Sequence, residues 1–135
     1  MDVARQRAAH HEASHAVACL QLGLPIIKIT IAHGESYLQR GYYQQTPGLA
    51  VEFLSIMSLA GSEGEKLFFP PAADGYGDSI DLVMVRRYLR PRSELEFISE
   101  TARLRAAARR LVEAVDQDLD YRCRPVEVRL RPIVW

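Results

Sequence analysis

Residues 3–22 read VARQRAAHHEASHAVACLQL, and their pattern predicts the helix on which the rest of the fold depends. Small and apolar residues, together with His11 and His15, recur every three or four positions, which is the spacing of one helical face. The helix should end at Gly23-Leu24-Pro25, because glycine and proline interrupt helical backbone.

The next segments carry strand and then helix signals. Residues 26–31, IIKITI, are rich in β-branched side chains and predict a strand, with residues 41–44 as its partner. Thr46-Pro47 resembles a helix start, and the helix should run to Phe69, before two prolines. This order predicts an α+β fold that is mainly helical, with a small sheet or hairpin.

The C-terminal half predicts two more helices. One covers about residues 78–90 and is stopped by Pro91. Ser93 and Glu96 fit a capping box that opens a longer helix, ending near Leu119. The tail includes an alternating segment, residues 126–131, that predicts a strand. A chain of 135 residues has the size of a single domain, so we expect one domain over 1–135.

Composition narrows the class of protein. Lys plus Arg (17) equals Asp plus Glu (17), so no net charge favours nucleic acid or an anionic membrane. Most arginines lie between Arg86 and Arg131, which predicts a solvated basic face. No run approaches the roughly 18 apolar residues of a membrane span, and the N-terminus does not resemble a signal peptide. Cys19 and Cys123 form no CxxC pair, and we expect free thiols in a cytoplasmic protein.

The motif HEASH, residues 11–15, predicts zinc chemistry. On a helix His11 and His15 lie one turn apart on one face, so both imidazoles can bind one metal ion. Glu12 lies about 100° further round the helix, beside the metal and not on it. A carboxylate there can act as general base on a zinc-activated water and then protonate the leaving amine.

A catalytic zinc needs a third protein ligand and one open position. The residues alone leave several candidates open, namely His33, Glu52, Glu63, Glu65, Asp78 and Asp81. Asp78 and Asp81 have an alternative explanation, since acidic side chains at the start of a helix cap its amides without any metal.

Other polar residues near the motif allow two interpretations each. His10 should lie at the surface or behind the ligands, and Cys19 is either a soft ligand or a core residue. Glu65 either orients one of the two histidines or lies on a helix surface. The hydroxyl groups of Tyr42, Tyr43 and Tyr76 could stabilise an oxyanion, but buried packing is the simpler interpretation.

Three blocks of the chain resemble, in order, the peptidase domain of FtsH-type membrane-bound AAA+ zinc proteases. HEASHAV at residues 11–17 is similar to the family pattern HEAGHA(V/L), and LAGSEGEKLF at 59–68 is similar to (L/G)(A/G)GRxAExLxF. GDSIDL at 77–82 is similar to GAxND(L/I). The likeness is strongest over residues 5–90, and it leaves the place of residues 120–135 undecided.

The resemblance implies a zincin-like domain in which Asp81 is the third ligand, beside His11 and His15, with Glu12 as general base. The implied function is a zinc-dependent metalloendopeptidase that acts on peptides or unfolded protein segments. Ser14 departs from the family pattern, which has glycine there, and a side chain at this position could crowd neighbouring backbone. The chain also has no Walker A motif and no membrane span, so an ATPase or oligomeric partner would come from another chain.

Two other functions remain compatible with the sequence. The first is a catalytically idle module of the same fold that binds zinc, peptides or partner subunits. The second is a non-proteolytic zinc hydrolase that acts on a small amide. Retention of Glu12 favours an enzyme, because a structural zinc site needs no general base.

Overall fold

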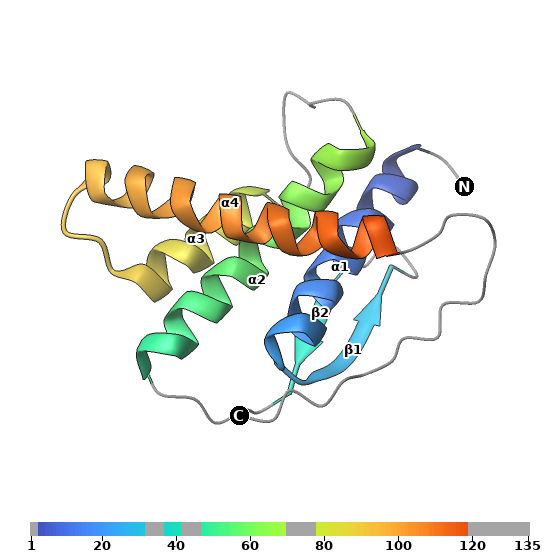
Figure 1. Cartoon of the computed structure of the whole chain (residues 1–135), viewed down its shortest axis with the longest axis horizontal. Helices are drawn as coiled ribbons and strands as arrows, with labels where there is room; N and C mark the ends of the chain where they lie inside the picture. Colours follow the sequence, from blue (N-terminus) through green and yellow to red (C-terminus); the bar gives the residue numbers. More distant parts are fainter. Residues whose placement is uncertain (1–2, 32–36, 42–46, 70–77, 119–135) are drawn as a thin grey trace.

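The computed structural model describes residues 3–31, 37–41, 47–69 and 78–118 (Figure 1). Within these ranges the elements in chain order are α1 (Val3–Leu22), β1 (Ile26–Thr30), β2 (Tyr37–Arg40), α2 (Pro47–Phe68), α3 (Asp78–Leu89) and α4 (Glu94–Asp118). The prediction of a mainly helical α+β fold with a small sheet is confirmed. The expected strand at 126–131 and the residues His33, Tyr42, Tyr43 and Tyr76 lie outside the described ranges.

Helix α1 ends where the sequence predicts, and the cause is a glycine in the left-handed region. Gly23 has φ 71°, and the Leu24 amide donates a 2.8 Å hydrogen bond to the Cys19 carbonyl. This is the Schellman arrangement, in which two apolar side chains pack across the turn. Leu24 and Cys19 are both buried, so the same turn anchors the end of α1 in the core.

The two strands form an antiparallel hairpin, but the predicted partner segment is wrong. β1 pairs with β2, residues 37–40, in a register that places Thr30 opposite Tyr37 and Ile29 opposite Leu38. β2 alternates in exposure, and Leu38 packs against the core, which fixes this register. Gly41 lies just past the strand and donates a 2.7 Å hydrogen bond to the Pro25 carbonyl, while residues 42–44 are not described.

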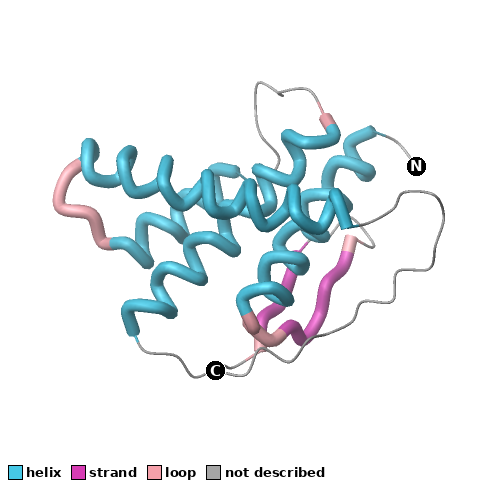
Figure 2. The backbone as a smooth tube through the Cα atoms, viewed as in Figure 1, coloured by secondary structure: helices cyan, strands magenta, loops and turns pink. Residues whose placement is uncertain are grey.

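Helix α2 is the centre of the fold. It packs against α1, α3 and α4, and its residues Leu59 and Ala60 are fully buried. Leu104 and Ala108 of α4 are also fully buried and complete this core. Figure 2 shows α4 running across the other helices, with the strands beside α1. None of the described helices is both long and apolar enough to cross a bilayer.

The capping box of α4 forms with one difference from the prediction. The Ser93 hydroxyl accepts a 3.1 Å hydrogen bond from the Glu96 amide, as expected. The Glu96 carboxylate reaches back to the amide of Arg92, at 3.0 Å, instead of that of Ser93. Two residues before Arg92, Arg90 has φ 47°, and the chain turns sharply there between α3 and α4.

Helices α1 and α2 approach closely at Ser14 and Gly64. Ser14 is buried, and its hydroxyl donates a 2.7 Å hydrogen bond to the His10 carbonyl. A Cβ atom at Gly64 would overlap both side-chain atoms of Ser14. The crowding expected from a side chain at position 14 is therefore relieved by the absence of one at position 64.

This pair predicts a coupled stability effect. Gly64→Ala should lower the free energy of unfolding by about 1–3 kcal/mol, the usual range for overpacking a core. In a Ser14→Gly background the same change should stabilise the protein by up to about 1 kcal/mol, because alanine is the better helix former. Urea unfolding of the two single variants and the double variant measures the coupling. Additive effects would contradict direct contact between the two positions.

Candidate metal centre

Two residues of α1 and one of α3 bring their metal-binding atoms together. His11 Nε2 lies 2.9 Å from Asp81 Oδ2, and His15 Nε2 lies 3.3 Å from the same oxygen. One ligand atom from each residue falls within 4.8 Å of the others. His11 and His15 are buried and Asp81 is half-buried. The three side chains thus form one compact group, although Asp81 follows His11 by 70 positions in the chain.

The other ring nitrogen of each histidine is held by an acceptor. His11 Nδ1 lies 3.2 Å from Glu65 Oε2, and His15 Nδ1 lies 2.7 Å from the Met57 carbonyl oxygen. A carbonyl oxygen accepts hydrogen bonds and cannot donate them, so His15 donates through Nδ1. A charged Glu65 carboxylate also only accepts, so beside it His11 donates through Nδ1 as well. Each neutral ring then presents the lone pair of Nε2 to the other members of the group, as a metal ligand does.

The three converging side chains need a proton or a metal ion between them. Two Nε2 lone pairs and a carboxylate oxygen face one another at hydrogen-bond distance, and three acceptors repel unless a proton or metal ion lies among them. Ligand atoms about 2.0–2.2 Å from a tetrahedral zinc lie roughly 3.3–3.6 Å apart. The 3.3 Å between His15 Nε2 and Asp81 Oδ2 falls in this range, and the 2.9 Å between His11 Nε2 and Asp81 Oδ2 is shorter. The donor set of two imidazoles and one carboxylate therefore fits zinc.

The pKa values of His15 and Asp81 in the protein without metal reflect the attraction between the two side chains. Burial alone would lower the pKa of His15, but its hydrogen bond to Asp81 and the charge of Asp81 outweigh burial and raise the pKa. Burial alone would raise the pKa of Asp81, yet hydrogen bonds from His11 and His15 leave the pKa below its usual value. The first shift favours a positive charge on His15, and the second favours a negative charge on Asp81.

Gly61 of α2 lies against the Nε2 edges of the two imidazoles. A Cβ atom at this position would clash with Nε2 of both His11 and His15. The missing side chain lets the α2 backbone support the rings at close range, which is a use of glycine that propensity does not predict.

The group opens into a cleft of about 630 Å³. The lining residues come from α1, β2, α2 and α3, and they are His11, Glu12, His15, Tyr37, Leu38, Gln39, Arg40, Met57, Ser58, Ile80, Asp81, Met84 and Tyr88. Glu12 is buried yet borders the cleft, and its carboxylate is not one of the three converging ligands. An acidic side chain thus lies beside the candidate metal position, as the helical spacing predicts.

No protein-family model, curated protein or solved structure matches the chain.

The other candidate ligands from the sequence lie in different environments. Glu52 forms a 2.9 Å ion pair with Arg103, and Glu63 lies 3.4 Å from Arg105, so both carboxylates bind cations of α4. Asp78 begins α3, but its side chain is not described. Among the residues that the structure describes, only Asp81 joins the two histidines in a metal-binding group.

The alternatives for the remaining polar residues are now resolved by their contacts. Glu65 is buried and contacts His11, so its interpretation as a helix-surface residue is wrong. His10 packs on Phe68, with ring centroids 4.4 Å apart, and is not part of the group. Cys19 is a core residue, and burial raises the pKa of its thiol to about 11, while the nearby positive charge of Arg40 opposes the shift.

Sequence reasoning overlooked two side chains at this site. Arg7 donates to Glu65 at 3.2 Å and so stabilises the carboxylate that holds His11. Tyr88 lines the cleft from α3. Helical spacing was the available signal for both, since Arg7 precedes His11 by four residues and Tyr88 follows Asp81 by seven.

Proposed function

We propose that this chain is a zinc-dependent metallopeptidase that hydrolyses peptide bonds in peptides or unfolded protein segments. The observation that carries the proposal is the convergence of His11, His15 and Asp81 beside the carboxylate of Glu12 in an open cleft. Two imidazoles and one carboxylate are a common protein ligand set for catalytic zinc, which keeps a further position for water or substrate.

Each side chain has a distinct role in this proposal. His11, His15 and Asp81 hold the ion, while Glu65 and the Met57 carbonyl orient the two rings through Nδ1. Zinc bound there would polarise a carbonyl group and lower the pKa of a water molecule towards about 7. Glu12 takes the proton of the attacking water and returns it to the leaving amine.

The cleft also suggests how an extended substrate is held. Zinc peptidases commonly add a substrate strand to a sheet edge, and the sequence pointed to the strand at 26–31 for this role. The cleft is lined instead by all four residues of β2, 37–40, so we assign the substrate-binding edge to β2. Leu38, Met57 and Met84 supply apolar contact surface within the same cleft.

A relationship to FtsH-type peptidase domains, with a zincin-like arrangement, is part of the proposal. It is supported by the positions of the three resembling blocks, because each one contributes to the group. The first block supplies His11 and His15, the second supplies Gly61 and Glu65, and the third supplies Asp81. By analogy, an ATPase on another chain would feed unfolded substrate to the cleft.

The test combines metal analysis with an activity assay. The purified protein should bind one zinc ion per chain and cut an unfolded protein substrate. Removal of zinc by a chelator should abolish cleavage and lower the melting temperature, since a bound ion stabilises the folded state by mass action. Zinc binding without cleavage would indicate the idle module, and cleavage of a small amide but no peptide would indicate the other hydrolase. A protein that binds no zinc would refute the metal centre.

A further inference from the structure

Helix α2 carries a buried hydroxyl group that the proposed chemistry does not use. Ser58 is only 4% exposed, and it lines the cleft. Among the described residues its hydroxyl has no hydrogen-bond partner. A buried hydroxyl without a partner loses free energy, which is recovered when a molecule in the cleft supplies the missing bond. Water fills this role in the free protein, and a bound substrate displaces it.

The other buried serines of the described helices use their hydroxyl groups within the protein. Such a serine usually bonds a carbonyl three or four residues earlier on its own helix. Ser14, Ser55 and Ser62 do so, with the carbonyls of His10, Val51 and Leu59 as acceptors. Thr101 of α4 also lacks a partner, but it does not line the cleft. Of the described residues, Ser58 thus supplies the buried hydroxyl that both lacks a partner and lines the cleft.

Ser58 lies on the face of α2 that supports the metal ligands. Gly61 and Glu65 follow it by three and seven positions, which places all three on one helical face. Gly61 lies against Nε2 of both His11 and His15, and Glu65 lies 3.2 Å from His11 Nδ1. Ser58 is therefore about one helical turn, or about 5.4 Å along the axis, from the residue that touches the metal-binding atoms.

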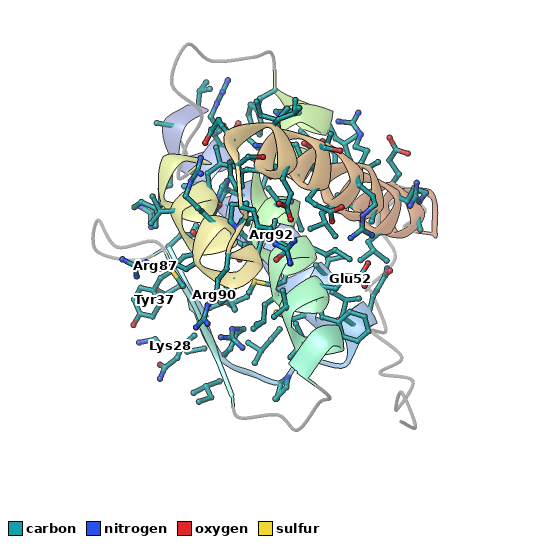
Figure 3. The ribbon with its side chains drawn as sticks, turned by 90° about the vertical axis from the view of Figure 1, so that its left-hand side faces the viewer. Lys28, Tyr37, Glu52, Arg87, Arg90 and Arg92 are labelled. Atoms are coloured by element: carbon teal, nitrogen blue, oxygen red, sulfur yellow. The ribbon has the colours of Figure 1, made fainter. Side chains whose placement is uncertain are left out.

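The edge of β2 and Ser58 line the same cleft. In Figure 3 Tyr37 of β2 and Glu52 of α2 lie on opposite sides of the α2 ribbon, and Glu52 pairs with Arg103 of α4. A peptide added to β2 therefore lies along the side of α2 that is turned away from this pair. An extended peptide advances about 3.3 Å per residue, so with one carbonyl group at the metal, a carbonyl one or two residues away reaches the turn of Ser58.

This side of the cleft needs a hydrogen-bond donor. Once the two imidazoles bind a metal ion through Nε2, they have no donor left for a substrate, because each Nδ1 is already bonded within the protein. A charged carboxylate and a thioether only accept hydrogen bonds. Ser58 is then the donor among the side chains of α1 and α2 that line the cleft, which are His11, Glu12, His15, Met57 and Ser58.

We propose that Ser58 binds the substrate, and that its hydroxyl donates a hydrogen bond to a main-chain carbonyl oxygen one or two residues from the bond that is cut. This inference rests on the proposed peptidase function and adds a substrate-binding residue to it. Every peptide offers main-chain acceptors, so the contact strengthens binding without selecting a sequence. Loss of one such hydrogen bond should weaken peptide binding about three- to tenfold.

The first experiment measures peptide binding without cleavage. A fluorescein-labelled peptide rich in leucine is titrated, at saturating zinc, with the chain that carries Glu12→Gln, and anisotropy gives the Kd. Addition of Ser58→Ala should raise the Kd about three- to tenfold. Ser55→Ala is the matched control, because it removes the same group from the same helix, but this hydroxyl bonds the Val51 carbonyl and does not line the cleft. An unchanged Kd for Ser58→Ala, or an equal rise for Ser55→Ala, would overturn the inference.

A second measurement identifies the acceptor. The same peptide is made with a single thioamide at successive positions, because sulfur accepts hydrogen bonds more weakly than oxygen. At the carbonyl that Ser58 contacts, the thioamide should weaken binding to the chain with serine and have no further effect on the chain with Ser58→Ala. Independent effects of the two changes at every position would show that there is no direct contact.

The stability of Ser58→Ala separates substrate binding from a purely structural role. The free energy of unfolding should stay the same or rise slightly, because alanine is the better helix former and the hydroxyl has no bond within the described chain to lose. Urea unfolding measures this change. If Ser58→Ala unfolded at lower urea and bound the peptide as before, the serine would serve only packing and the inference would be wrong.

The two proposals fail in different ways. If the wild-type chain cuts the peptide and Ser58→Ala binds and cuts it equally well, the peptidase stands and the Ser58 contact is refuted. If the peptide binds with the thioamide dependence on Ser58 but the wild-type chain cuts no peptide, the contact stands and the peptidase is refuted. If the peptide does not bind at all, the contact is refuted.

Discussion

Replacement of Glu12 by Gln should lower the rate of peptide cleavage by about 10²- to 10⁴-fold, which is the usual contribution of a positioned general base. Glutamine has nearly the same shape but cannot accept the proton of the attacking water at neutral pH. The Glu12 carboxylate is separate from the three converging ligands, so the variant should retain its zinc. Steady-state kinetics and metal content, measured on the same preparation, test both parts.

Glu52→Gln is a suitable control for this experiment. It makes the same chemical change on the same type of side chain, but Glu52 pairs with Arg103 on the face that α2 shares with α4. Its activity should equal that of the wild type. If Glu12→Gln cleaved at the wild-type rate, Glu12 would not be the general base. Loss of zinc in Glu12→Gln would show that this carboxylate is a ligand.

The second large effect is expected at Asp81. Structural zinc sites with four ligands bind with about 10–16 kcal/mol, or roughly 3 kcal/mol per ligand, so Asp81→Ala should weaken zinc binding more than a hundredfold. Competition with a chromophoric chelator measures this change directly. Activity at limiting zinc should fall in parallel.

The competing explanation for Asp81 is a helix cap. It predicts a loss of about 0.3–1 kcal/mol in stability through the helix dipole, with no effect on zinc. Glu94→Gln is the matched comparison, because Glu94 is an acidic residue in the first turn of α4 and lies outside the cleft. If Asp81→Ala and Glu94→Gln had the same small effect on stability and none on zinc affinity, the helix-cap explanation would be correct.

The parts of the fold that depend on local rules could be predicted from the sequence. The bounds of α1 follow from its periodicity and from Gly23, and the start of α4 follows from Ser93. The pattern predicted residues 41–44 as the strand partner. The actual partner, β2, is fixed by Leu38, whose contact with the core is a tertiary interaction that a local pattern does not contain.

The candidate site was predictable to a similar extent. His11, Glu12 and His15 lie on one helix, so their mutual geometry follows from the helical repeat alone. Asp81 was one of several acidic candidates, and a resemblance singled it out. Its position beside the histidines depends on how α3 packs on α2 and how α2 packs on α1.

The contact between Ser14 and Gly64 also limits which pairs of residues the two positions can hold together. The FtsH-type pattern that the chain resembles has glycine at position 14 and alanine at position 64. The combination of serine with alanine is disfavoured by overlap, by the same cost expected for the Gly64→Ala variant. Glycine at both positions avoids the overlap, at the cost of a more flexible helix. The motif of the metal centre and the second helix are therefore coupled through one contact, and a library that varies both positions should recover the serine–alanine combination least often of the four.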